Sequence, residues 1–136
     1  MIKPICHDPM LLARKAAPAT FADLGVARDL RDTLAANLDR CVGMAANMIG
    51  APKAIIVYVD GGEIHTMLNP VITKKSGEYD TEEGCLSLSG VRPCKRYQMI
   101  TVEWQGSDLK KCTGTFTGFT AQIIQHECDH LAGILI

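Results

Sequence analysis

Hydrophobic residues recur at steps of three and four between Asp23 and Cys41. This spacing places them on one face of a helix and predicts an amphipathic helix of about 18 residues. The recurring positions are Leu24, Ala27, Leu30, Leu34 and Leu38. A shorter helix is expected over residues 9–16, where Pro9 suits the first helical turn because it has no backbone N–H to leave unpaired.

Strand patterns fill the middle of the chain. AIIVYV (54–59) is β-branched and aromatic, and YQMITVEW (97–104) alternates in polarity, as strands do. Asp60-Gly61-Gly62 predicts a hairpin turn into a further strand, EIHTMLNP (63–70). LKKCTGTF (109–116) is expected to be the last strand.

Three segments have weaker patterns. CVGMAANMIGAP (41–52) is rich in small residues and predicts a loop or tight turn where the backbone approaches another group closely. Asn69-Pro70 is expected to interrupt a strand, and VITKKSG (71–77) to continue it irregularly. EYDTEEGCLSLSG (78–90) is acidic and predicts turns.

The last helix is expected from about Gly118 to about Leu131, with Gly133 as its stop signal. Helices are thus followed by several antiparallel strands and one final helix. This order predicts an α+β fold in which the last helix packs against a sheet. A chain of 136 residues is long enough for one core, so we expect a single domain over residues 1–136.

The composition narrows the classes of function. Hydrophobic residues make up 47% of the chain, charged residues 21%, and the net charge is −1. There is no Lys/Arg run, so direct nucleic-acid binding and an anionic membrane surface are not expected. We expect a cytoplasmic protein, because no apolar stretch approaches the roughly 20 residues of a membrane span and the start lacks a signal-peptide core. The six cysteines form no CxxC pair and are expected to be free thiols.

The chemistry is concentrated in the final helix, where residues 126–130 form an HExxH pattern. Side chains four apart share a helix face, so His126 and His130 can hold one metal ion with Glu127 beside them. Two solvated histidines on a surface helix are the alternative. The apolar residues before the pattern favour a buried helix, and Gln125 and Asp129 are candidates to orient the imidazole nitrogens.

A catalytic metal site usually takes three protein ligands and one water. Only six residues follow His130 and none is a metal ligand, so the third ligand must lie upstream. The candidates are His7, His65, the acidic stretch 78–83 and a cysteine. We favour Cys85 because Gly84 precedes it in a predicted turn, which allows close approach to an ion; a buried free thiol is the alternative.

Three segments in this order resemble the signature segments of the peptide deformylases: CVGMAANMIG, EGCLS (83–87) and QHECDH (125–130). The resemblance covers almost the whole chain. It implies antiparallel sheets around a central helix that carries both histidines. It also implies hydrolysis of the N-formyl group from the initiator methionine of new polypeptides, with one divalent ion, usually Fe(II) and replaceable by Ni, Co or Zn. An N-formylmethionyl peptide would be the substrate, and transient ribosome association is an implied possibility.

The resemblance also implies roles for individual residues. Cys85, His126 and His130 correspond to the metal ligands, and Glu127 to the general base and acid. The main-chain N–H of Leu86 corresponds to a donor to the oxyanion.

Further positions correspond to the surroundings of the family's site. Gly43 and the loop after it, including Met44, correspond to a substrate-binding segment. Arg92 corresponds to a substrate contact, and Glu83 to a supporting position near the site.

The first segment departs from the family pattern. Cys41 replaces a usual glycine, and Met48 replaces a usual glutamine that donates a hydrogen bond to the oxyanion. Methionine has no donor, and loss of such a bond typically costs about 10²–10³ in rate. The amide of Asn47 is an alternative donor.

These departures leave a second hypothesis, a degenerate deformylase-like metal-binding protein with weak or altered amidase activity. A zinc-dependent peptidase and a metal-free protein are further alternatives.

Overall fold

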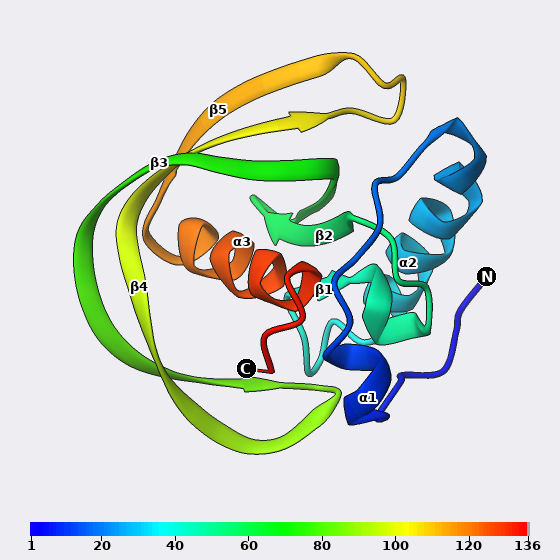
Figure 1. Cartoon of the computed structure of the whole chain (residues 1–136), viewed down its shortest axis with the longest axis horizontal. Coiled ribbons are helices and arrows are strands. Elements are labelled where there is room, and N and C mark those ends of the chain that lie inside the picture. Colours follow the sequence, from blue (N-terminus) through cyan, green and yellow to red (C-terminus); the bar gives the residue numbers. More distant parts are fainter. Residues whose placement is uncertain (136) are drawn as a thin grey trace.

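One antiparallel sheet, with strand order β1-β2-β3-β4-β5, surrounds the C-terminal helix (Figure 1). The computed structural model describes residues 1–135. The strands are β1 (Gly43–Ala45), β2 (Ile55–Asp60), β3 (Glu63–Cys85), β4 (Leu88–Gln105) and β5 (Lys111–Thr117). The helices are α1 (Pro9–Leu12), α2 (Leu24–Ala36) and α3 (Gly118–Leu131), and 3₁₀ turns cover Phe21–Asp23 (η1) and Ala46–Ile49 (η2). The predicted α+β fold is confirmed; residue 136 of the predicted domain lies outside the described residues.

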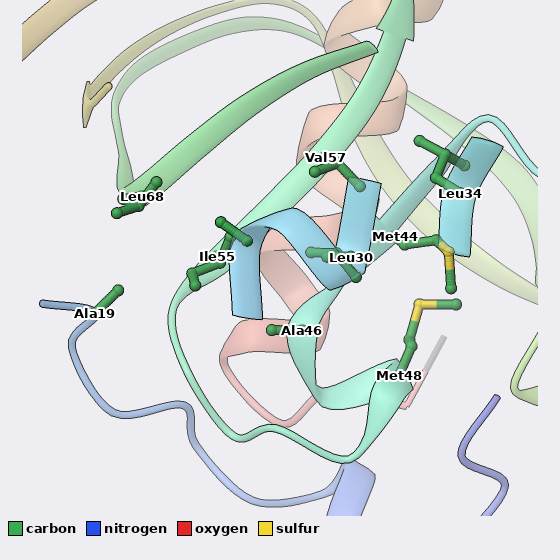
Figure 2. Packing of buried hydrophobic residues seen from close by; sticks show 10 residues of the cluster. Ala19, Leu30, Leu34, Met44, Ala46, Met48, Ile55, Val57 and Leu68 are labelled. Atoms are coloured by element: carbon green, nitrogen blue, oxygen red, sulfur yellow. The ribbon is translucent and has the colours of Figure 1, made fainter. Parts of the chain in front are cut away.

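Strand β2 separates two hydrophobic clusters because its successive side chains point to opposite faces of the sheet. Ile55 and Val57 pack in the cluster beneath α2, which also contains Met44 and Met48. Figure 2 shows these residues close together, with the Met44 and Met48 side chains turned toward each other. Ile56 and Tyr58, together with residues of β4 and α3, form the second cluster. The sheet is therefore covered by α2 on one face and α3 on the other.

The long hairpin of β3 and β4 confirms one prediction and corrects another. As expected, Asn69-Pro70 interrupts the regular pairing and the strand continues irregularly beyond it: the register shifts between Leu68 and Val71 and again between Ile72 and Lys74, and Asn69 has φ 52°. The stretch 78–85 is not a series of turns but pairs with residues 88–97 of β4. This end of the hairpin is mostly solvent-exposed and polar, so it carries no hydrophobic alternation that would predict a strand.

The predicted helix ends differ from the structure for local reasons. α2 ends at Ala36 rather than near Cys41, because Asn37 closes the helix with a bond from its N–H to the Leu34 carbonyl at 2.9 Å. α1 is one turn long, with Asp8 as its N-cap, and ends well before residue 16. α3 matches its predicted range, and among the described helices none is long and apolar enough to span a membrane.

The segment 41–52 contains the predicted tight turn and also a short strand that was not predicted. It contains strand β1, which pairs with β2 from Gly43 opposite Tyr58 to Ala45 opposite Ile56, and then the turn η2. Its small residues nevertheless serve the predicted purpose, because β1 and η2 both contact α3 closely.

Gly133→Ala is expected to destabilise the fold by about 2–4 kcal/mol. Gly133 ends α3 with φ +80°, and an added Cβ would lie 2.4 Å from the carbonyl oxygen of Ala13. Gly61→Ala is the matched control, since Gly61 also has positive φ (+63°) but nothing within 4 Å of an added Cβ. Urea unfolding of both variants checks this; equal losses of stability would contradict the predicted clash.

Candidate metal centre

α3 and the end of β3 bring three ligand-type side chains to one point. One ligand atom from each of Cys85, His126 and His130 lies within 4.8 Å of the other two. His126 and His130 are 8% and 0% exposed, so neither is a solvated surface histidine. The structure thus places the sequence-predicted trio together, with the cysteine reaching the helix from the last residue of β3.

The spacing of the two imidazoles fits a shared ion. Their Nε2 atoms are 3.0 Å apart, and the rings stand edge to face at 4.7 Å between centroids. Two nitrogens that ligate one tetrahedral ion at about 2.0–2.1 Å lie about 3.3 Å apart. One sulfur and two imidazole nitrogens also form a donor set suited to a divalent transition metal. The residues present therefore fit a metal site.

The other candidates for a third ligand lie elsewhere. A ring nitrogen of His65 is 3.2 Å from the Asp60 carbonyl oxygen, and its ring stacks on Tyr58. Nδ1 of His7 is 2.8 Å from the carbonyl oxygen of Ser87. The acidic stretch contributes Glu83, which supports a histidine rather than joining the trio.

Glu83 anchors the imidazole of His126. Its Oε1 is 2.7 Å from Nδ1 of His126, and Arg96 donates to both of its oxygens at 2.7 and 3.0 Å. Arg96 also donates to Asp129 at 2.7 Å, and Gln122 donates to Glu83 at 2.8 Å. This buried network joins β3, β4 and α3 directly behind the metal centre.

The sequence prediction that Gln125 and Asp129 orient the imidazoles is wrong. Gln125 binds the Tyr97 backbone, accepting from its N–H at 2.8 Å and donating to its carbonyl at 2.9 Å. Asp129 accepts from Arg96 instead. Arg96 was missed because nothing in the local sequence distinguishes it from Arg92; its partners come from other elements.

The pKa values of the two histidines are shifted in opposite directions. Burial disfavours charge on His126, but hydrogen bonds to Cys85 and Glu83 outweigh it and raise its pKa to about 10. Burial and the nearby His126 lower the pKa of His130 to about 3. Burial alone would raise the pKa of Glu83, but its bonds to His126, Arg96 and Gln122 lower it below the usual range.

Glu127 has the properties of a proton-transfer group. It is 4% exposed, its Oε1 has no hydrogen-bond partner within residues 1–135, and burial raises its pKa to about 7. A carboxyl group with a pKa near neutrality can both accept and return a proton at physiological pH.

A cavity of about 280 Å³ opens beside these groups. Gly43, Leu86, Ile123 and Glu127 are among its walls, with Met48 also lining it. The chain needs glycine at position 43, because an added Cβ would lie 2.6 Å from Cγ2 of Ile123 and 2.9 Å from Oε2 of Glu127.

Two predicted substrate contacts do not reach this cavity. Met44 is 0% exposed and belongs to the hydrophobic core shown in Figure 2. Arg92 does not line the cavity, and its guanidinium donates to the Ser89 carbonyl at 3.4 Å within the hairpin. Leu88 and Ile124 likewise lie outside the lining, whereas the apolar side chain of Ile123 lies in it.

The structure shows the contacts made by the residues of the first segment that depart from the family pattern, and by Asn47 beside them. Asn47 does not replace the missing oxyanion donor, because it is fully buried and its amide donates to the His130 carbonyl at 2.9 Å. The Met48 sulfur instead accepts a weak bond from the Ala45 N–H at 3.5 Å. The Cys41 thiol donates to the Gly43 carbonyl at 2.8 Å, and burial together with nearby Glu127 raises its pKa to about 11. Cys41 is therefore a protonated thiol and a poor nucleophile.

A helix that carries HExxH, a cysteine that approaches it from a strand end and a buried carboxyl beside a cavity define a metal-dependent hydrolase. The profile of the Polypeptide deformylase family matches residues 2–136, and the chain belongs to this family. The predicted activity is confirmed: it is a metal-dependent hydrolase that removes the N-formyl group from nascent polypeptides. Nothing in the comparisons supports the alternative of a degenerate protein.

Known relatives agree in sequence and fold. The chain is 54% identical to a peptide deformylase of Clostridium beijerinckii over the full length of both chains. It is 37% identical to peptide deformylase 2 of Clostridium acetobutylicum, covering 92% of this chain and 85% of that one. The crystal structure of a Legionella pneumophila peptide deformylase has a TM-score of 0.88 at 33% identity, covering 99% of this chain and 83% of that one. The crystal structure of the Thermus thermophilus enzyme gives a TM-score of 0.88 at 35% identity, covering 99% and 84%.

Arg96→Ala is expected to lower the free energy of unfolding of the metal-free protein by about 3–5 kcal/mol, because it leaves the Glu83 carboxylate buried without its cation. Lys95→Ala is the control, since Lys95 pairs with Glu78 at the exposed surface and should change little. Denaturant unfolding measures both. A loss below about 1 kcal/mol in Arg96→Ala would contradict the anchoring role of the network.

Gly43→Ala is expected to lower kcat/KM about 10²-fold or more, because relief of its clash must move β1 or the side chains of Ile123 and Glu127. Gly25→Ala adds the same methyl group in α2, where nothing lies within 4 Å, and should leave activity unchanged. Steady-state kinetics on a formylated peptide separate the two. Normal kinetics in Gly43→Ala would show that the close approach is not needed.

Proposed function

We propose that Cys85, His126 and His130 hold one divalent ion, and that Glu127 and the main chain of Leu86 act on the formyl group bound beside it. The supporting observation is the convergence of the three ligand atoms within 4.8 Å, next to a cavity that Glu127 and Leu86 line. We take residues 1–136 as one domain, since both hydrophobic clusters are formed by elements from distant parts of the chain.

Fe(II) is the proposed ion in the cell, with Zn, Ni or Co able to replace it. A thiolate and two imidazoles form a borderline-soft donor set that binds all four ions. The donor atoms therefore do not distinguish Fe(II) from Zn, Ni or Co. When bound, the ion acidifies a water molecule and polarises the formyl carbonyl.

The residues of the chain then supply proton transfer and charge stabilisation. Glu127 accepts the proton of the attacking water and passes it to the leaving amine, which yields formate and a free N-terminus. The Leu86 N–H donates to the oxygen that becomes negative as the carbonyl is attacked. Bulk water has little access to these groups, because Glu127 and both histidines are almost fully buried.

The substrate backbone is proposed to lie along β1. β1 is an edge strand, paired on one side with β2, and its residue Gly43 lines the cavity together with Val42. A free strand edge can pair with an extended peptide through main-chain hydrogen bonds, which do not depend on the peptide's sequence. This mode suits an enzyme that must process many different nascent chains.

Transient association with the ribosome and a cytoplasmic location are proposed from the substrate alone. Nascent formylated chains emerge at the ribosome, so an enzyme that acts on them must meet them there.

The test is formate release from a formyl-Met peptide by protein loaded anaerobically with Fe(II). Glu127→Ala is expected to lower kcat by about 10²–10⁴ while it retains the ion, because the proton acceptor is lost and the ligands are not. Chelation should abolish activity and re-addition of the ion restore it. Activity of Glu127→Ala equal to wild type would refute the proposed role, and cleavage of an internal bond in an unblocked peptide would favour a peptidase.

Met48→Gln is expected to raise kcat by about 10- to 100-fold with little change in KM, because an amide donor would face the cavity that Met48 lines. Met44→Gln is the control, since Met44 is equally buried but lies outside the cavity lining, and it should only destabilise the core. Steady-state kinetics and thermal unfolding of both variants measure these effects on activity and stability. No gain in Met48→Gln would mean that the oxyanion is already stabilised sufficiently without it.

A further inference from the structure

The two histidines of α3 differ in the support of their outer ring nitrogens. Nδ1 of His126 is 2.7 Å from Glu83, whereas Nδ1 of His130 is buried and has no hydrogen-bond partner within the described chain. Because Nε2 of His130 faces Nε2 of His126 at 3.0 Å, Nε2 is the atom that ligates, and Nδ1 must then carry the ring proton. His130 therefore has a buried N–H donor that needs an acceptor.

Asn47 has the complementary deficiency. It lies in η2, is 0% exposed, and its Nδ2 donates to the backbone carbonyl of His130 at 2.9 Å. Its Oδ1 is buried and without a partner in residues 1–135. An unsatisfied donor and an unsatisfied acceptor thus belong to two residues that are already in direct contact.

The two other buried polar atoms without partners in this range suit His130 less well. Oε1 of Glu127 belongs to a residue that lines the reaction cavity, which His130 does not line. Oγ of Ser87 lies at the turn between β3 and β4, and no hydrogen bond of the described residues joins Ser87 to His130. The contact through its amide singles out Asn47.

We propose that Asn47 is a positioning residue for His130. Its Oδ1 accepts the Nδ1 proton through one shared internal water, while its Nδ2 holds the carbonyl of the same residue. Buried waters occupy sites where several unsatisfied polar groups converge, which these two residues provide. Such an outer partner fixes the tautomer and orientation of a metal-binding histidine and makes it a stronger ligand. This inference rests on the metal site proposed above.

Metal affinity of the full chain, measured by chelator competition with Zn(II), tests the proposal. Asn47→Leu keeps the volume but removes donor and acceptor, and should weaken binding about 10- to 100-fold. Asn47→Asp keeps the acceptor, and the His130 carbonyl still accepts from the Gly133 N–H at 3.0 Å. The Zn(II) affinity of this variant should lie within about threefold of the wild-type value, or above it. Equal losses in both variants would overturn the proposal, because only the backbone bond would then matter.

Asn37→Leu is the matched control. Asn37 is also buried and donates to a backbone carbonyl, that of Thr33 at 2.7 Å, but it lies at the end of α2. It should lose stability and keep its metal affinity. Ser87→Ala is the rival variant: weaker binding there, with normal binding in Asn47→Leu, would assign the partner to Ser87 and overturn the role of Asn47.

A spectroscopic readout does not depend on how well the variants fold. In the Zn(II)-loaded wild type, ¹⁵N-edited NMR of the imidazoles should show a slowly exchanging proton on Nδ1 of His130. A proton on Nε2 instead would overturn the proposal. If the wild type binds no Zn(II) at all, the proposed metal site fails; if it binds normally and Asn47→Leu does too, only the role of Asn47 fails.

Discussion

Two imidazole nitrogens held 3.0 Å apart in the protein interior impose the constraint on which the site depends. Without an ion the two Nε2 atoms approach this closely as a hydrogen bond, in which one of them carries a proton; in the metal-binding tautomer both present lone pairs, and a cation between them takes the place of that proton. The four-residue spacing on α3 sets this geometry, and Cys85 adds a sulfur at the same point. The fold must therefore hold the three proposed ligand groups at this spacing.

The long hairpin of β3 and β4 meets this requirement. It curves around α3 (Figure 1), and alternation along β3 places Glu83 and Cys85 on the same side of the strand. One of them supports His126 and the other joins the ligand trio. A buried carboxylate is tolerable only with full compensation, which Arg96 provides by bridging Glu83 and Asp129 across three elements. The network that satisfies this charge also fixes the distance between hairpin and helix.

Helix ranges and site residues are predicted best from the sequence where the residues that determine them lie within one element. Gly133 marks the end of α3 as a stop signal, and the pairing of His126 with His130 follows from helical geometry. The exposed end of the hairpin has no hydrophobic alternation, because its strands pair without packing on a core. Arg96 and Asn47 could not be assigned either, since their partners Glu83 and His130 lie 13 and 83 residues away.

Two neighbouring residues of the turn η2 contact different parts of the site. Met48 lines the cavity without offering a donor, whereas its neighbour Asn47 turns its amide to the C-terminal end of α3. In the proposed mechanism, stabilisation of the oxyanion then falls on the ion and the Leu86 N–H alone. A preorganised charge is effective only if its ligands do not have to reorient during the reaction. Firm support of both histidines, His126 by Glu83 and His130 through Asn47, is therefore the condition under which a site without the glutamine donor remains effective.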